Sequence, residues 1–213
     1  MKRELLSIGQ NRKLGKDVSV FNLPRSITCP GKTPVCSKVC YADKSQRMYK
    51  TAAAKRMRNY IASQRPDFVE KITAELLAPL RKGRVMKAIS PVRTAAACIA
   101  SHRWQESGDV YSQMYLDKIF QVCRNTPRII HLMYTKSFHL DWSKKPDNLK
   151  VYWSVDNSTA APVPKGPTAY LLLKGEAIPS DLTCIHPGVP THYCGCGCQT
   201  CWIGKFNVYF PKH

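Results

Sequence analysis

Acidic residues are scarce in this chain, and it contains no long apolar run. Only 14 Asp and Glu stand against 33 Lys and Arg in 213 residues, which gives a formal net charge of +19. No stretch of about eighteen apolar residues is present, which argues against a membrane-spanning helix. The first residues, Met1-Lys2-Arg3-Glu4, lead into no apolar segment of the kind found in signal peptides. The sequence therefore predicts a soluble cytoplasmic protein with no membrane partner.

Cysteine is too rare here for a miniature domain built on disulfides, since the chain has only ten. The cysteines cluster towards the two ends of a chain that is long enough to bury one substantial core. In a mid-sized chain in the reducing cytosol, clustered thiols are typical of metal ligands. We expect a single domain over residues 1–213, made of a basic cysteine-loop segment (1–65), a β/α core (66–180) and a cysteine-rich tail (181–213).

The first cysteine group comprises Cys29, Cys36 and Cys40, with six and then three residues between them. The Pro and Gly residues in this stretch predict a turn that becomes regular only near Val39. Closely spaced thiolates repel one another unless a metal shares their charge, and soft sulfur ligands favour iron–sulfur clusters, zinc or cuprous copper. Structural zinc usually takes its cysteines in closer pairs, so the spacing favours a [4Fe–4S] cluster. Zinc, a disulfide or inert thiols are the alternatives.

The second cysteine group lies near the C-terminus, where glycines between the thiols allow the backbone to fold tightly around a metal. Its five thiols exceed the four that one tetrahedral site needs. We therefore expect a second iron–sulfur or zinc site with one cysteine as a bystander. The predicted ligands are Cys184, Cys194, Cys198 and Cys201. The last three of these also have the CxxxCxxC spacing used by radical S-adenosylmethionine enzymes.

Apolar periodicity predicts strands that are separated by helices or long loops. Such alternation implies an α/β protein with a mainly parallel sheet, either open or curled into a partial (β/α) barrel. Chemistry in these folds gathers at the carboxyl ends of the strands, which here carry residues 103–109, 135–137 and 154–157. Cys98 and Cys123 are expected to be small core residues. The expected strands are residues 18–23, 95–100, 129–134, 149–155 and 169–173, and the expected helices are 43–64, 67–80 and a helix after residue 109 that includes Cys123.

Positive charge is concentrated in the first third of the chain. Residues 1–65 hold fifteen of the 33 basic residues but only three acids, Glu4, Asp17 and Asp43. A polyanion is the expected partner of such a surface, and nucleic acid is the most common one. A host protein of the nucleic-acid machinery, or a solvated surface without a partner, is the alternative. The predicted phosphate contacts are Lys44, Lys50, Lys55, Arg47, Arg56 and Arg58, with Tyr49 or Tyr60 stacked on a base.

Several motifs together resemble the bacteriophage family called gene product 88. They are Cys29-x6-Cys36-x3-Cys40-Tyr41-Ala42, the turn with Ser107-Gly108-Asp109, Tyr134-Thr135-Lys136-Ser137, Asn148-Leu149 with Ser154-Val155, and Cys198-x2-Cys201-Trp202. The chain is also similar to a phage family related to radical S-adenosylmethionine proteins. The resemblance covers about residues 20–205 and supplies no activity. It implies a phage protein with a partial (β/α) barrel and a [4Fe–4S] cluster on Cys29, Cys36 and Cys40.

The second resemblance implies a site for S-adenosylmethionine. Asp109 of the Ser107-Gly108-Asp109 turn, or Glu106, would hold its amine, and Ser154 or Asn157 its ribose or carboxylate. Each of these residues also suits a helix cap or a turn. Two functions follow. The first is an iron–sulfur protein whose basic face binds nucleic acid or host nucleic-acid machinery. The second is a radical S-adenosylmethionine-like enzyme that acts on nucleic acid or a related substrate, and a structural zinc protein is a further alternative.

Overall fold

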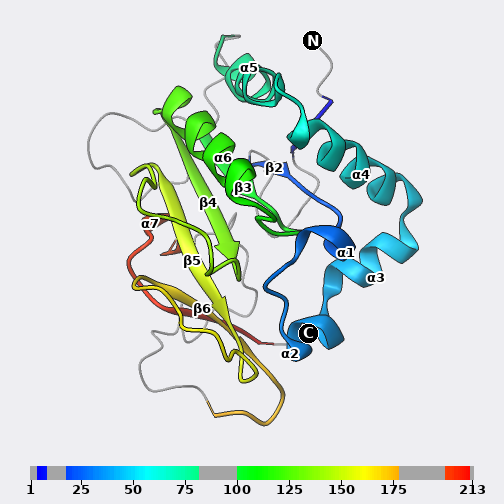
Figure 1. The fold of residues 1–213 in the computed structure, drawn as a ribbon, viewed down its shortest axis with the longest axis vertical. Coiled ribbons are helices and arrows are strands. Elements are labelled where there is room, and N and C mark those ends of the chain that lie inside the picture. The colour runs from blue at the N-terminus through cyan, green and yellow to red at the C-terminus, as the bar shows by residue number, and fades with distance from the viewer. Residues whose placement is uncertain (1–3, 9–17, 82–99, 178–199, 212–213) are drawn as a thin grey trace.

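In the described part of the chain, seven strands form one sheet in which every strand is hydrogen-bonded to its neighbours in sequence, in the order β1-β2-β3-β4-β5-β6-β7 (Figure 1). The computed structural model describes residues 4–8, 18–81, 100–177 and 200–211. β1 runs antiparallel to β2, and all the other neighbouring strands are parallel. The strands are β1 (Ser7–Ile8), β2 (Ser19–Phe21), β3 (Ala100–Trp104), β4 (Ile129–Thr135), β5 (Leu149–Val155), β6 (Thr168–Leu172) and β7 (Val208–Pro211).

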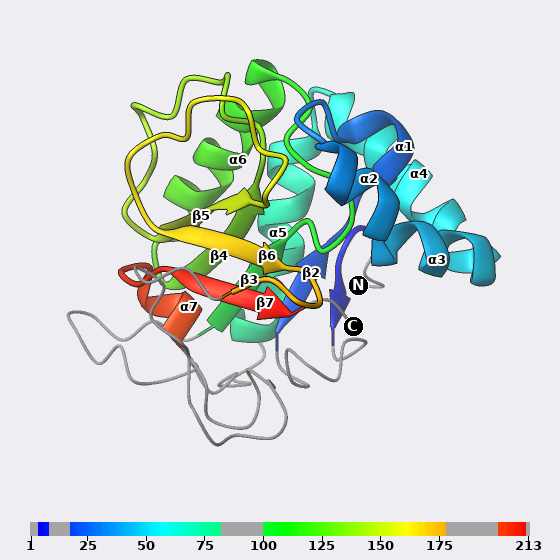
Figure 2. The ribbon, with the colours of Figure 1, turned by 90° about the horizontal axis from the view of Figure 1, so that it is seen from below.

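Helices cover both faces of the sheet. Figure 2 shows α5 and α6 on one face and the short α7 on the other. Within the described segments, no helix is both long and apolar enough to span a bilayer. The helices are α1 (Arg25–Thr28), α2 (Pro34–Val39), α3 (Tyr41–Met48), α4 (Lys50–Gln64), α5 (Phe68–Arg81), α6 (Gln113–Asn125) and α7 (Thr200–Ile203).

The core consists of two layers because successive side chains of a strand point to opposite faces of the sheet. In β4, Ile129 and Met133 pack in the larger layer, which includes α5 and α6. Ile130 and Leu132 pack in the smaller layer, which includes Trp202 of α7. A strand that is buried on both faces has apolar side chains at consecutive positions, which is the pattern that predicts β4 from the sequence.

The predicted α/β class and mainly parallel sheet are confirmed, and of the two architectures expected, the described strands form the open one, with β1 and β7 at its edges. The amphipathic pattern after residue 67 corresponds to α5, where Phe68, Ile72 and Leu76 are buried. Cys123 is buried in α6, as expected for a core residue. Residues 95–99, with Cys98, lie outside the described residues, and the strand expected there is described from Ala100 onwards.

Two predictions of helix extent are wrong. The cysteine loop becomes helical at Pro34 rather than Val39, because the side chain of Thr33 caps α2. Proline is also well suited to the first helical position, since the N–H that it lacks would have no partner within the helix there. The helix expected over residues 43–64 is two helices that meet at the extended residue Tyr49. Across this break, Arg56 of α4 reaches back to the carbonyl of Ala42 in α3.

Candidate metal centre at the carboxyl edge of the sheet

The three N-terminal cysteines lie in the connection that follows β2. Cys29 ends α1, Cys36 lies within α2, and Cys40 separates α2 from α3. All three thiols are half-buried. The side chain of Thr33 caps α2 by accepting a hydrogen bond from the backbone N–H of Cys36 at 3.0 Å. A short capped helix therefore fixes the direction of the middle cysteine.

Two glycines let this connection pack tightly against the ends of neighbouring strands. A Cβ atom on Gly31 would lie 2.1 Å from the carbonyl oxygen of Lys136, which directly follows β4. Gly108 follows β3 and has a φ of +81°, and a Cβ there would lie 2.5 Å from Oγ1 of Thr28. The backbone N–H of Asp109 also donates to the carbonyl of Thr28 at 3.0 Å. The cysteine connection is therefore held against the carboxyl ends of β3 and β4.

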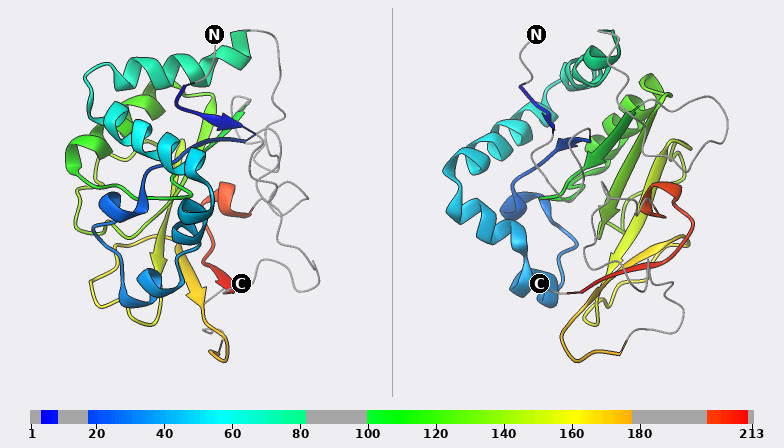
Figure 3. Two further views of the ribbon diagram at one scale, coloured as in Figure 1. Left: turned by 90° about the vertical axis from the view of Figure 1, so that its right-hand side faces the viewer. Right: turned by 180° about the vertical axis from the view of Figure 1, so that it is seen from behind.

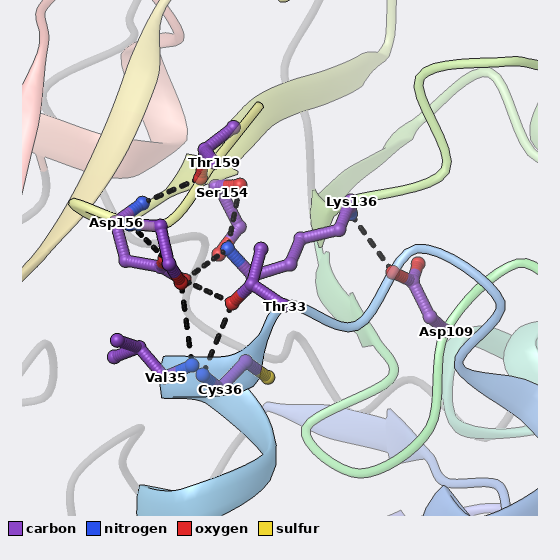
Figure 4. A network of polar contacts seen from close by, with 9 residues as sticks. Thr33, Val35, Cys36, Asp109, Lys136, Ser154, Asp156 and Thr159 are labelled. Atoms are coloured by element: carbon purple, nitrogen blue, oxygen red, sulfur yellow. Dashed lines mark hydrogen bonds and ion pairs between the residues drawn. The ribbon is translucent and has the colours of Figure 1, made fainter. Parts of the chain in front are cut away.

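A buried carboxylate links the cysteine connection to the end of β5 (Figure 4). Asp156 Oδ2 accepts hydrogen bonds from Oγ1 of Thr33 at 2.6 Å and from Nζ of Lys136 at 2.8 Å. Its other oxygen accepts from the hydroxyl of Ser158 at 2.6 Å, and that hydroxyl in turn accepts from the N–H of Val35 at 3.2 Å. One carboxylate thus positions α2 relative to β4 and β5.

The hydrogen bonds keep Asp156 ionised. Burial alone would raise its pKa, but the bonds from Lys136, Ser158 and Thr33 together outweigh burial and lower it below the usual range. Lys136 is also buried, and its ammonium donates a second bond to the carbonyl of Ser154 at 3.0 Å. The centre therefore contains an ion pair that is fully formed at neutral pH.

The three thiols lie within electrostatic range of one another. Burial is the main cause that raises the pKa of the Cys29 thiol to about 12, and negative charge on Asp109, Cys36 and Cys40 adds to this rise. Burial also raises the pKa of Cys36, where the ammonium of Lys136 opposes the effect. Without a metal, the Cys29 thiol is therefore neutral at pH 7.

Asp109 lies beneath the cysteine connection and is almost completely buried. Its carboxylate accepts bonds from the hydroxyl of Thr135 at 2.6 Å and from the backbone N–H groups of Val110 and Lys136 at 2.7 and 2.8 Å. Burial raises the pKa of Asp109 against the opposing effect of these bonds. Asp109 joins the turn after β3 to the end of β4, and its predicted contact with a cofactor amine stays a prediction.

The other predicted cofactor residues occupy the same edge of the sheet. The hydroxyl of Ser107 donates to the carbonyl of Leu23 at 2.9 Å, so it holds the turn after β3 against the end of β2. Ser154 is half-buried near the end of β5, and Asn157 is exposed and bonded to the carboxylate of Glu176. The structure thus brings the turn after β3 and the end of β5 to one edge, while their binding of a cofactor stays a prediction.

The C-terminal cysteine group is mostly beyond the described residues, which exclude Cys184, Cys194 and Cys198. Cys201 is buried in α7 beside Trp202, in the core layer opposite α5 and α6. Among the residues that the structure describes, no three His, Cys, Asp or Glu side chains are grouped closely enough to hold one metal ion. The predicted metal ligands of both groups therefore stay predictions.

The predicted phosphate contacts lie on α3 and α4, which follow the outer side of the molecule away from β5–β7 (Figure 3, pale blue and cyan). Lys55 is half-buried and donates to the carbonyl of Leu6 at 2.8 Å. Arg56 is a correction to the expected surface, because it is buried and its guanidinium donates to Ala42 and Ser45. The exposed members are Lys44, Arg47, Lys50 and Arg58.

Sequence reasoning missed several residues of this centre as site residues, namely Lys136, Asp156 and Thr33. The sequence could have indicated Lys136 and Asp156, because both directly follow strands and the carboxyl ends of parallel strands meet at one edge of the sheet. Only the fold shows that Thr33, which lies 123 residues before Asp156, bonds to it.

The fold and the site define the class of this protein. It is an α/β protein with a mostly parallel open sheet and a three-cysteine connection at the carboxyl edge of that sheet. Residues 2–181 match the family described as Gene product 88, and the chain belongs to this phage protein family. The Gene 88 protein of Mycobacterium phage L5 is 28% identical over 138 residues, which cover 62% of this chain and 54% of that protein. The chain thus matches about half the length of this relative. No solved structure matches the chain.

Proposed function

We propose that the chain is a phage iron–sulfur protein in which Cys29, Cys36 and Cys40 bind one [4Fe–4S] cluster at the carboxyl edge of the sheet. The observation that carries the proposal is that one connection, packed against the carboxyl ends of β3 and β4, holds three half-buried thiols beside buried Asp109. Ionising three half-buried thiols next to a carboxylate is unfavourable unless a cation accompanies them. Iron supplies that positive charge and displaces the thiol protons.

The donor set fits a cluster. It contains three soft sulfur atoms from one connection, and Lys136 provides a nearby positive charge that favours the Cys36 thiolate. Ligands of a single ion lie within roughly 4 Å of one another, because each Zn–S bond is about 2.3 Å long. In a cluster each thiolate binds a different iron atom, so its ligands are further apart. Three thiolates leave one iron of a [4Fe–4S] cluster free to bind a small molecule.

The residues around the thiols have structural and electrostatic roles in this proposal. Asp156 holds Lys136 and Thr33, so α2 and its cysteine keep their position relative to the sheet. Asp109 fixes the turn after β3 beneath Cys29. These contacts pre-organise the thiols before the cluster binds, which lowers the conformational entropy that binding must overcome.

Anaerobic purification followed by absorption spectroscopy tests the cluster. The protein should be brown, with a broad absorption band at about 400 nm that dithionite bleaches. Cys29→Ser, Cys36→Ser and Cys40→Ser should each weaken the band, and Cys123→Ser in the core of α6 should not. Colourless protein that contains one zinc ion per chain would contradict the proposal and favour a structural zinc protein.

A radical S-adenosylmethionine-like enzyme is the alternative form of the same proposal. It is supported by the consecutive order of the parallel strands β2–β7, which matches the strand order of a (β/α) barrel although the sheet of described strands is open. The turn at Ser107-Gly108-Asp109 and the end of β5 would then face the bound molecule. Cleavage of S-adenosylmethionine by the reduced wild type, and not by Cys36→Ser, would establish that the protein is such an enzyme. A reducible cluster that does not cleave S-adenosylmethionine would favour the non-catalytic iron–sulfur protein instead.

The outer face of α3 and α4 is proposed to bind nucleic acid. Lys44, Arg47, Lys50 and Arg58 are exposed there, and Tyr49 between the helices is 58% exposed. Exposed cations can follow a phosphate backbone, and an exposed aromatic ring can stack on a base. A host protein of the nucleic-acid machinery is the alternative partner for this face.

Binding to single-stranded and double-stranded nucleic acid as a function of salt tests this second function. The logarithm of the affinity should fall linearly with the logarithm of the salt concentration, by about 0.7–0.9 per phosphate contact. Replacing Lys44, Lys50 and Arg58 by Glu should reduce that slope. The matched control replaces Arg124, Arg128 and Lys144 by Glu, which makes the same charge change on another exposed surface. Absence of any retention at about 50 mM salt would rule out nucleic acid as the partner.

A further inference from the structure

Arg103 is a buried cation with which no carboxylate in the described part of the chain is paired. It lies in β3 and is only 9% exposed. Its neighbours in the strand, His102 and Trp104, point towards α5 and α6, so Arg103 points to the opposite face of the sheet. Among the described residues, no carboxylate forms an ion pair with Arg103, and its Nη1 atom is buried without a hydrogen-bond acceptor.

An aromatic platform fixes the guanidinium. Its Cζ atom lies 4.0 Å from the centre of the Tyr134 ring in β4. That ring is held in turn by Tyr152 at 5.3 Å and by Phe210 at 5.5 Å between ring centres. A guanidinium that lies over an aromatic face presents its N–H groups sideways, in a planar fork. Phe210 is 39% exposed, so the platform extends to the surface of the described structure.

An unpaired buried charge is energetically unfavourable, and proteins normally compensate it with an opposite charge. The sequence outside the described residues contains only two acids, Asp17 and Asp181. Lys136, which directly follows the neighbouring strand β4, is already neutralised by Asp156. The planar fork of arginine is suited to the two oxygens of a carboxylate or phosphate.

We propose that Arg103, held on the Tyr134 ring, binds the carboxylate or phosphate group of a small-molecule ligand near the carboxyl edge of the sheet. The ligand group would accept hydrogen bonds from the edge of the guanidinium and supply the missing negative charge. In parallel α/β sheets this edge is where ligands bind. The site uses none of the three thiols, so it does not depend on the proposed cluster.

Thermal unfolding in the presence of small anions tests this site. Full-length protein is melted in potassium phosphate, in potassium acetate and in potassium chloride at matched ionic strength. A site that is filled at about 20 mM anion should raise the melting temperature by roughly 2–4 °C above the value in chloride. The more effective of phosphate and acetate identifies the chemical class of the ligand group.

The variant Arg103→Gln should lose the anion response. In chloride it should be at least as stable as the wild type, because the substitution removes a buried charge that no carboxylate of the described residues neutralises. Arg128→Gln on another exposed surface should keep the response. Arg103→Lys keeps the charge without the fork, so its response should be weaker. A wild type that responds equally to all three salts, or a response that Arg103→Gln retains, would overturn the proposal.

Discussion

The ammonium nitrogen of Lys136 lies 2.8 Å from the carboxylate of Asp156, and the two side chains are 8% and 0% exposed. Lys136 follows β4 and Asp156 follows β5, so this ion pair joins two strand ends. Asp156 also accepts the hydroxyl hydrogen bond of Thr33, which caps the helix that carries Cys36. The stability of the sheet edge and the position of one proposed cluster ligand therefore depend on the same carboxylate.

Removing that carboxylate should destabilise the fold. Asp156→Leu leaves the ammonium of Lys136 buried without a counter-charge, which should lower the free energy of unfolding by about 3–5 kcal/mol. Urea unfolding measures the change. The double variant Lys136→Met with Asp156→Leu removes both charges and should recover part of the loss. A double variant that is less stable than the two single effects predict would contradict the ion-pair explanation.

Replacing Gly31 should affect the metal centre more than a replacement at another glycine. Alanine there would bring a Cβ atom to 2.1 Å from the carbonyl oxygen of Lys136, so the cysteine connection must move away from β4. We expect Gly31→Ala to lose about half or more of its iron on gel filtration, since metal affinity depends on pre-organised ligands. Gly175→Ala is the control: its φ of +88° makes alanine locally strained, but a Cβ there meets nothing within 4 Å, so the cysteine connection is not pushed away from β4. Equal iron content in the two variants would show that the connection is not constrained at Gly31.

Two buried histidines should make the fold sensitive to acid. His131 accepts a hydrogen bond from Nε1 of Trp104 at 3.1 Å, and its other nitrogen contacts the hydroxyl of Thr126 at 2.8 Å. Burial lowers the pKa of His131 to about 3 and holds that of His102 well below 6.5. Below pH 6.5 the unfolded chain takes up protons that the folded chain does not, so stability falls as the pH falls. Each histidine contributes about 1.4 kcal/mol per pH unit.

Urea unfolding between pH 7 and pH 5 measures this dependence. The variant His131→Gln should have a shallower slope, because one of the two buried histidines no longer contributes. His139→Gln is the control, since His139 is exposed and should keep the slope of the wild type. A slope that His131→Gln leaves unchanged would show that other groups cause the acid sensitivity.

Two arginines on α4 should have different roles although they are two residues apart. Arg56 is buried and donates at 3.2 Å to Ala42 and at 3.1 Å to Ser45, whereas Arg58 is exposed. Arg56→Gln should cost about 1–3 kcal/mol of stability and leave the salt dependence of nucleic-acid binding unchanged. Arg58→Gln should leave stability unchanged and reduce the salt slope by about 0.7–0.9. The reverse result would mean that the exposed face of α4 does not contact phosphate.

Local patterns were sufficient to predict most of the sheet and the packing helices. The consecutive apolar residues of β4 and the spacing of Phe68, Ile72 and Leu76 in α5 each reflect burial that a sequence displays directly. The break at Tyr49 is not visible in this way, and the contact that Arg56 makes across it with α3 is apparent only in the fold.

The candidate centre was predictable in part for the same reason. Cys29, Cys36 and Cys40 form a local spacing pattern, so the sequence indicates them without the fold. Arg103 and Asp156 are notable only because of their neighbours on other strands. Arg103 lies over the ring of Tyr134 and pairs with no carboxylate of the described residues, whereas Asp156 forms an ion pair with Lys136. The strand ends marked the correct edge, but only the register of the sheet showed which side chains meet.

Iron and acid-labile sulfide per chain, measured on anaerobically purified protein, test the central claim most directly. The account predicts about four of each in the wild type and in Cys123→Ser, because a [4Fe–4S] cluster contains four irons and four sulfides. It predicts loss of both in the variant with Cys29, Cys36 and Cys40 replaced together by Ser. A wild type that binds no iron under these conditions, or a triple variant that retains the wild-type content, would contradict it.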